Sequence, residues 1–202
     1  ERERERERDL LNDEANVIEA GGTAFPMPRG APISIPMNVE IYMREQRTAG
    51  LVIIQDGKLR LEEYGLGFDA NGQWTSFSVA KSFTSTLVGA AIKDGFINSI
   101  EDKVSDYIPN LKGSAYDDVS IKQLLTMTSG VRWNEDYEDK NSDVALFNEH
   151  KAEPGVDATV SYMRTLSREA PAGDKWAYKT GETNLIGVLV SSATGKTLSA
   201  YL

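Results

Sequence analysis

Cysteine is absent from this 202-residue sequence, and His150 is its only histidine. The lack of cysteine excludes disulfides, thiolate metal sites and a cysteine nucleophile. One histidine cannot build a His-rich metal site, and a Ser-His-Asp triad would have to use His150. Because the neighbouring residues 148–151 are polar, a solvated surface histidine is the favoured interpretation.

Positive charge is also scarce. There are 22 basic and 31 acidic side chains, which gives a net charge of −9. Such a chain repels nucleic acid and anionic membranes, so nucleic-acid binding is disfavoured. No apolar run is long enough for a transmembrane helix. The amino terminus is charged and does not resemble a signal peptide, although removal of a leader would leave the same sequence, so localisation stays open.

The first 48 residues predict an N-terminal arm. Residues 1–8 alternate glutamate and arginine, a pattern that favours a solvated helix or a tail without function. The prolines and glycines of residues 21–36 exclude a regular helix and predict an extended segment.

Residues 49–64 predict a β-hairpin, with the turn at Asp56-Gly57. The apolar run 51–54 is expected to be buried on both faces. A two-stranded hairpin is not stable alone, so further strands are required. We therefore assign residues 49–75 to the start of an α/β domain.

Residues 76–202 are assigned to a helical domain, because apolar side chains recur at three- and four-residue spacing through most of it. The expected helices are one from about Val79, closed by Gly95; a short one opened by a capping box over 99–102 and ended by Pro109; one after Ser120, with Gln123 in the box position, which stops at Gly130; one over 183–194, ended by Gly195; and the start of another over 198–202. Residues 132–143 are acidic and aromatic, and predict a loop.

Residues 76–84 (SFSVAKSFT) are the most informative segment, because Ser78 and Lys81 stand three apart at a predicted helix start. That spacing puts both side chains on one helix face. A serine hydroxyl is a poor nucleophile until a base takes its proton, and lysine can be that base when burial and the helix dipole lower its pKa. The backbone N–H of Ser78 could also face a developing oxyanion. The alternative is that Ser78 only caps the helix and Lys81 is a surface charge, because this pair often occurs by chance.

Two later segments favour the first interpretation: residues 124–130 (LLTMTSG) and 171–181 (PAGDKWAYKTG). With these three motifs in order, the chain from about residue 51 to 202 resembles the serine β-lactamase and penicillin-binding-protein superfamily. Within it, the likeness is strongest to class C-type β-lactamases, their carboxylesterase relatives and the 6-aminohexanoate-oligomer hydrolases.

The resemblance implies a β-lactamase-like, or transpeptidase-like, fold with an α/β portion and an all-helical portion. It also implies that Ser78 is the acylated serine, Lys81 its base or proton shuttle, and Tyr178 the phenol of the proton relay. The alternative for Tyr178 is a buried aromatic before a helix. Trp133 or Tyr137 is expected to line the substrate cleft. No metal or organic cofactor is required.

The sequence departs from the family in three ways. Thr180 stands where class C β-lactamases carry asparagine, which weakens the case for efficient β-lactam hydrolysis and leaves a hydroxyl as the substrate-binding group. No glutamate motif is found for the deacylating water, so Tyr178 and Lys81 would activate it. The Lys-Thr-Gly or His-x-Gly strand is absent, so we expect only the N-terminal part of the fold, with the C-terminal part of the α/β domain missing or present as a separate chain.

The predicted activity is two-step acyl transfer to Ser78 from small esters or linear amides, with β-lactams second and D-alanyl peptides third. This chain alone is expected to be inactive. Two other classes stay open: an acyl sensor or binding module that keeps its adduct, and an inactive fragment. The resemblance favours a periplasmic or secreted location.

Overall fold

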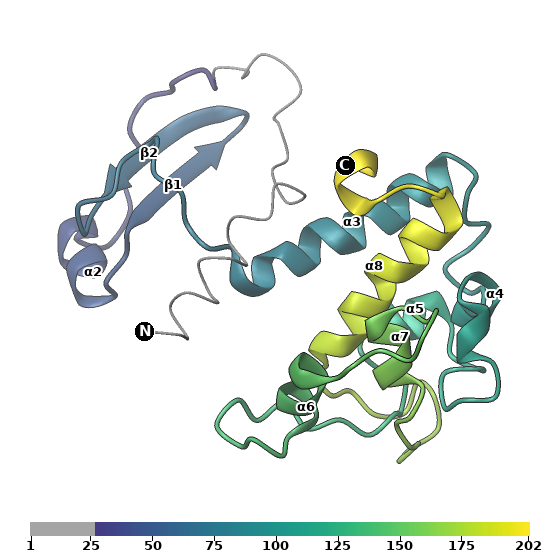
Figure 1. The fold of residues 1–202 in the computed structure, drawn as a ribbon. Helices are drawn as coiled ribbons and strands as arrows, with labels where there is room; N and C mark the ends of the chain where they lie inside the picture. Colours follow the sequence, from purple (N-terminus) through teal and green to yellow (C-terminus); the bar gives the residue numbers. More distant parts are fainter. Residues whose placement is uncertain (1–26) are drawn as a thin grey trace. The chain divides into compact units, whose positions relative to one another are not determined.

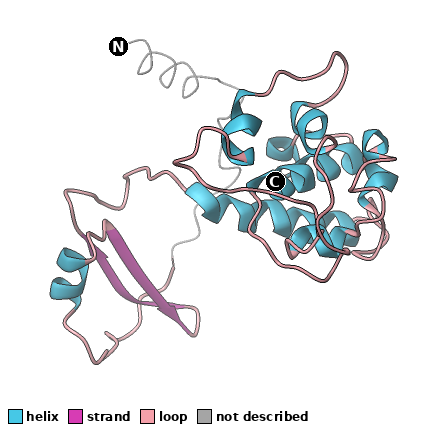
Figure 2. Ribbon diagram, turned by 90° about the horizontal axis from the view of Figure 1, so that it is seen from below, coloured by secondary structure: helices cyan, strands magenta, loops and turns pink. Residues whose placement is uncertain are grey.

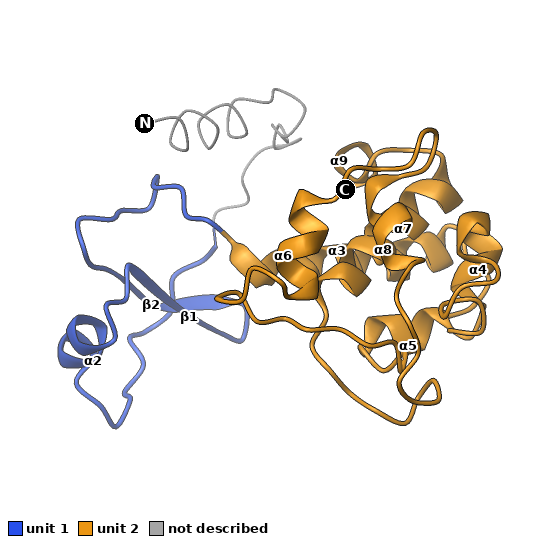
Figure 3. Ribbon diagram, turned by 60° about the horizontal axis from the view of Figure 1, so that its bottom comes forward, with its two compact units in different colours: residues 1–75 blue, residues 76–202 orange. Residues whose placement is uncertain are grey.

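The computed structural model describes residues 27–202 (Figure 1). Within that range, both β-strands precede residue 75 and the long helices follow it (Figure 2). The chain divides into two compact units, residues 1–75 and 76–202, and each is considered by itself (Figure 3). The helix or tail expected over residues 1–8 lies outside the described residues, as do residues 21–26 of the expected extended arm.

The first unit contains the expected hairpin. Strand β1 (Gly50–Gln55) pairs antiparallel with β2 (Lys58–Tyr64). Asp56 and Gly57 both have positive φ, 53° and 67°, as a two-residue type I′ turn requires. The hairpin prediction is therefore confirmed.

The expectation that the run 51–54 is buried on both faces is wrong for the described residues. Burial alternates along β1, and Val52 and Ile54 remain 50% and 53% exposed. The reason is that residues 27–202 contain only this two-stranded sheet, and none of the first unit's described elements covers that face.

Helix α2 (Val39–Glu45) was not predicted, and it lies in the segment assigned to the arm. The signal was Asn38, whose side-chain oxygen accepts a hydrogen bond of 2.9 Å from the Ile41 amide and caps the helix. Earlier in the arm, Gly30 donates to the Leu59 carbonyl at 2.9 Å, so this proline-rich stretch is extended beside β2, as expected.

The second unit is helical. Its elements are η2 (Phe77–Val79), α3 (Ala80–Lys93), α4 (Val104–Tyr107), η3 (Pro109–Leu111), α5 (Ile121–Leu125), α6 (Asp143–Glu149), α7 (Ala158–Met163), α8 (Thr180–Thr194) and α9 (Leu198–Tyr201). The two long helices, α3 and α8, pack side by side, and α4, α5, α6 and α7 also contact α8 (Figure 1). The apolar side chains of α8 are therefore the centre of this unit's core.

Two of the predicted helix boundaries are confirmed. Ser120 and Gln123 form a reciprocal capping box at the start of α5. Gly195 ends α8 in the left-handed conformation, with φ 69°. Helix α5 is shorter than expected. It ends at Leu125, whereas the sequence predicts an end near Gly130.

Of the boundaries expected around residues 99–109, the end is confirmed, because α4 stops at Tyr107, shortly before Pro109, but the start is wrong. Ser99 does donate to the Asp102 carboxylate at 3.1 Å, but α4 begins at Val104, and Pro109 opens η3. Lys103 is extended because it forms an antiparallel bridge with Ser120, so the helix cannot start before it.

Candidate active site

Ser78 and Lys81 lie where η2 passes into α3. The Lys81 Nζ is 3.2 Å from the Ser78 Oγ, to which it donates a hydrogen bond. The N-cap position of α3 is Val79, and it has no side-chain capping bond. This geometry disagrees with the alternative that Ser78 only caps the helix.

The backbone just before Ser78 is strained. Phe77 has a φ of 44°, in the left-handed region, and its side chain is exposed. A bulky residue in this region costs on the order of 1–3 kcal/mol, and such strain is concentrated at functional sites. Ser78 lies in the first helical turn, where the dipole of a helix start favours negative charge, although the Val79 amide already donates to the Ser76 carbonyl at 3.0 Å.

Tyr178 reaches the same oxygen from the segment that precedes α8. Its hydroxyl donates to the Ser78 Oγ at 2.8 Å, across 100 residues of sequence. The Lys81 Nζ also lies 5.3 Å from the centroid of the Tyr178 ring. The structure thus brings all three predicted catalytic side chains together around one hydroxyl oxygen.

The segment that carries Tyr178 is held by the loop after α5. Ala177 donates to the Met127 carbonyl at 3.1 Å, and Gly173 donates to the Thr128 carbonyl at 2.7 Å. Gly130, with φ 72°, lies so close to the Ala170 carbonyl that a Cβ would overlap it. The motif of residues 124–130 therefore acts as the backbone support of the motif that contains Tyr178.

Thr180 and Tyr137 meet at a carboxylate that the sequence analysis missed. Glu135 accepts the Thr180 amide at 2.9 Å, the Thr180 hydroxyl, and the Tyr137 hydroxyl at 2.5 Å. Burial alone would raise the pKa of Glu135, but these bonds and one from Trp133 hold it below its usual value. The only sequence signal for Glu135 was the acidic composition of the loop predicted over residues 132–143.

Trp133 and Tyr137 differ in accessibility. Trp133 is only 9% exposed and packs edge-on against Phe147 and Tyr162, while its Nε1 donates to Glu135. Tyr137 is 70% exposed. Of the two residues expected to line the cleft, Trp133 is thus a core side chain that supports Glu135, because its ring fills an aromatic cluster.

His150 takes no part in the Ser78 cluster. It is half-buried, so it is not the solvated surface side chain expected, and its Nε2 lies 2.8 Å from the Oγ of buried Ser161. In residues 27–202 no group of three or more His, Cys, Asp or Glu side chains could hold a metal ion. None of the helices in that range is long and apolar enough to span a bilayer.

A buried ion pair lies directly beside Tyr178 in the sequence. Lys179 and Glu182 are 1% and 0% exposed, and the Lys179 Nζ is 3.7 Å from the Glu182 Oε1. Burial raises the pKa of Glu182 to about 7, against the opposing effects of Lys179, Ser129 and Tyr116. Nothing in the sequence pattern predicted this pair.

The raised pKa of Glu182 predicts that stability falls as pH rises from about 4.5 to 7. In that window the unfolded chain, with the ordinary value of 4.5, has lost a proton that the folded chain still binds. The full effect is roughly 3 kcal/mol at 1.36 kcal/mol per pKa unit. Urea unfolding at pH 5 and pH 7.5 measures it, and Glu182→Gln is expected to reduce the slope.

The matched control is Glu169→Gln, which removes the carboxylate of the more exposed Lys175–Glu169 ion pair, at 3.0 Å. This variant should keep the pH dependence of the unsubstituted protein. Equal slopes for the unsubstituted protein and Glu182→Gln would contradict the prediction.

Comparison with known proteins gives the following matches. A family model described as Beta-lactamase matches residues 37–202. The chain is 29% identical over 174 residues to a 6-aminohexanoate-dimer hydrolase of Paenarthrobacter ureafaciens, covering 82% of this chain and 44% of that protein. It is 34% identical over 105 residues to a Beta-lactamase of Pseudomonas fluorescens, covering 48% of this chain and 29% of that protein.

Solved structures support a β-lactamase-like, transpeptidase-like fold. A candidate 6-aminohexanoate-dimer hydrolase from Bacillus anthracis superposes with a TM-score of 0.70 at 19% identity, covering 87% of this chain and 50% of that one. The D-alanine carboxypeptidase of Burkholderia cenocepacia gives 0.56 at 21% identity, covering 79% and 42%. The chain therefore spans about half the length of these proteins.

Proposed function

The chain belongs to the Beta-lactamase family, and on that premise we propose that it carries the acylation machinery of a serine hydrolase for linear amides or small esters. One observation supports this above all: Lys81 and Tyr178 both bond to the Ser78 Oγ, at 3.2 and 2.8 Å. A serine hydroxyl hydrogen-bonded to a group that can act as its base is a typical arrangement for nucleophilic catalysis, and the Tyr178 phenol adds a second group for proton transfer.

In the proposed mechanism, the Ser78 Oγ forms a bond to the substrate carbonyl carbon while its proton passes to the neutral amine of Lys81. The bond to the leaving nitrogen or oxygen then breaks, and Tyr178 delivers the proton that the leaving group needs. Lys81 in turn restores the proton of Tyr178. Water cleaves the acyl-enzyme by the same route in reverse, which releases the acid and regenerates the Ser78 hydroxyl.

The substrate preference rests on two observations. The Paenarthrobacter relative is, by its name, a hydrolase of 6-aminohexanoate dimer, which is a linear amide. In addition, Thr180 stands in place of the asparagine of class C β-lactamases, and its hydroxyl is bonded to Glu135. Linear amides and esters are therefore proposed first, β-lactams second and D-alanyl peptides third. Tyr137, exposed beside Thr180, is proposed to border the substrate.

Because this chain spans about half of its relatives, we propose that the cleft is completed by a further segment, on the same chain or on a separate one. By family resemblance that segment includes the strand that supplies the second oxyanion donor. We therefore propose that the 202-residue chain alone lacks turnover and that the complete gene product has it.

Intact-mass spectrometry over time tests the proposal. The complete gene product is incubated with a fluorophosphonate, with 6-aminohexanoate dimer and with a penicillin. A hydrolase shows a permanent fluorophosphonate adduct, and its substrate adduct decays as the acid is released. A substrate adduct that never decays would replace the hydrolase with an acyl sensor, and no adduct with any probe would leave an inactive relative.

A further inference from the structure

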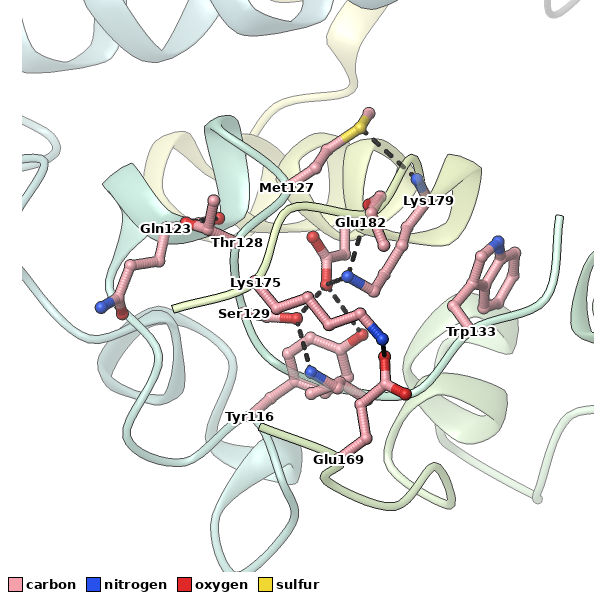
Figure 4. A network of polar contacts seen from close by, with 12 residues as sticks. Tyr116, Gln123, Met127, Thr128, Ser129, Trp133, Glu169, Lys175, Lys179 and Glu182 are labelled. Atoms are coloured by element: carbon pink, nitrogen blue, oxygen red, sulfur yellow. Dashed lines mark hydrogen bonds and ion pairs between the residues drawn. The ribbon is translucent and has the colours of Figure 1, made fainter. Parts of the chain in front are cut away.

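The proposed mechanism uses Tyr178 but not the two buried charges that follow it, Lys179 and Glu182. Both side chains lie inside the second unit, within a network of polar contacts (Figure 4). Ionised groups are expensive to bury, and burial raises the pKa of Glu182 to about 7, so both groups are charged only above neutral pH. Such a buried pair one residue from a proposed catalytic hydroxyl needs an explanation.

One oxygen of Glu182 receives nearly all the contacts of this network. Its Oε1 faces the Lys179 Nζ at 3.7 Å and accepts hydrogen bonds from the Ser129 hydroxyl and, at 3.3 Å, from the Tyr116 hydroxyl (Figure 4). The other oxygen, Oε2, is buried without a hydrogen-bond partner among the described residues. The pair is therefore tied to two segments far away in the sequence.

The same network fixes the backbone on both sides of Tyr178. Before it, Ala177 donates to the Met127 carbonyl at 3.1 Å. After it, the Lys179 amide contacts the Met127 sulfur at 3.4 Å, and the Lys179 ammonium donates to the Ala177 carbonyl at 3.4 Å. The Lys179 side chain thus folds back over the residue that carries the proposed catalytic phenol.

The first turn of α8 is held equally closely. A Cβ added to Gly181 would overlap the Met163 side chain and would lie 3.1 Å from the Trp133 ring. Glu182, one residue later, is anchored to Ser129 in the loop after α5. Neither residue can shift without breaking a packed or bonded contact.

We propose that Lys179 and Glu182 are positioning residues, whose buried ion pair holds the Tyr178 hydroxyl within hydrogen-bond reach of the Ser78 Oγ. The inference rests on the proposed function, because it gives the pair its role through Tyr178. A charged pair bonded to two hydroxyls has a directional geometry, whereas apolar side chains of the same volume would allow the segment to slide.

The decisive variant is the double substitution Lys179→Met with Glu182→Leu, made in the complete gene product. Replacing a buried pair by apolar side chains is often neutral for stability, but the buried Ser129 and Tyr116 hydroxyls lose their acceptor here, so a moderately lower melting temperature is expected. The rate constant of acylation is expected to fall roughly ten- to a hundredfold, because small misplacements of a catalytic group have effects of that size. The KM is expected to stay within about twofold, since the pair does not touch substrate.

The control is Lys175→Met with Glu169→Leu, which removes the neighbouring but more exposed pair. It is expected to leave acylation unchanged. A milder variant, Tyr116→Phe, removes only one hydroxyl from Glu182 and keeps both charges. It is expected to slow acylation severalfold, and it serves as the test if the double variant does not fold.

The readout specific to positioning comes from the Tyr178→Phe background. If the pair acts through Tyr178, adding the double substitution to Tyr178→Phe lowers the rate constant of acylation only slightly further. The effects of the two changes on that rate constant are then not additive. Full additivity, or an unchanged acylation rate in the double variant, would overturn the inference and leave the proposed function intact. Failure of the proposed function is recognised separately, by acylation that persists in Ser78→Ala.

Discussion

Ser78→Ala is expected to abolish covalent labelling of the complete gene product by a fluorophosphonate and to lower hydrolysis by on the order of 10⁴-fold or more. The physical reason is that Lys81 and Tyr178 both bond to the Ser78 Oγ, and no other hydroxyl in residues 27–202 accepts a hydrogen bond from both. Intact-mass spectrometry measures the labelling, and initial rates on an activated ester measure the hydrolysis. Ser78 is exposed, so the substitution should leave the melting temperature almost unchanged.

Ser76→Ala is the matched control for this prediction. Ser76 lies two residues earlier, is also exposed, and its side chain makes no capping bond at the start of η2. It should keep full labelling and activity. If Ser78→Ala were still labelled at one site, the nucleophile would be another residue, and the proposed mechanism would be wrong.

The contact between Ser78 and Lys81 could be predicted because their relationship is local. Ser78 and Lys81 are one helical turn apart, so a periodicity argument places them on the same face without knowledge of the rest of the fold. Tyr178 lies 100 residues away, and only the resemblance of its motif to a known family linked it to Ser78. The hydrogen bond between the Tyr178 hydroxyl and the Ser78 Oγ is seen only in the structure.

The supporting residues could not be predicted because each depends on contacts between distant segments. Glu135 meets Thr180 across 45 residues, and Glu182 meets Ser129 across 53. In the sequence both look like ordinary charged residues in a polar loop or at a helix start. Burial is what distinguishes them, and burial is decided by packing that no single segment specifies.

The boundary errors have the same origin. The capping pattern of residues 99–102 predicts too early a start for the helix at 104–107, because that pattern is local, whereas the bridge between Lys103 and Ser120 is not. The sequence does not predict helix α2 clearly, because the prolines of the preceding segment favour an extended arm. Local sequence patterns thus predict most helices and strands, whereas their exact boundaries depend on tertiary contacts.

Glu135 changes how the Thr180 position should be interpreted. A threonine hydroxyl could in principle turn toward a substrate, but here it bonds to a carboxylate whose pKa is held below its usual value by its donors. An ionised acceptor keeps such a bond over the whole neutral pH range. Thr180 is therefore better placed to fix the start of α8 and the exposed Tyr137 than to bind substrate by its own hydroxyl.

The second large effect is expected from Lys81→Met, which should slow acylation of Ser78 by roughly 10²- to 10⁴-fold, the usual contribution of a general base. Lys81 is half-buried, and its Nζ is 3.2 Å from the Ser78 Oγ, so methionine can fill the space but cannot accept a proton. Stopped-flow acylation with an activated ester gives the rate constant. Lys93→Met, at the exposed far end of α3, is the control and should react normally.

Lys81→Arg separates the two roles that the lysine could have. Arginine keeps the positive charge near the hydroxyl, but its guanidinium is not deprotonated in proteins and cannot take the serine proton. If Lys81 is the base, Lys81→Arg should be as slow as Lys81→Met. If Lys81→Arg restores the rate, the charge alone would suffice, and the proton would have to leave through Tyr178, the other group bonded to the Ser78 Oγ. Tyr178→Phe would then be expected to cause the roughly 10²- to 10⁴-fold loss of a general base. Comparison of Lys81→Met, Lys81→Arg and Tyr178→Phe therefore assigns the base.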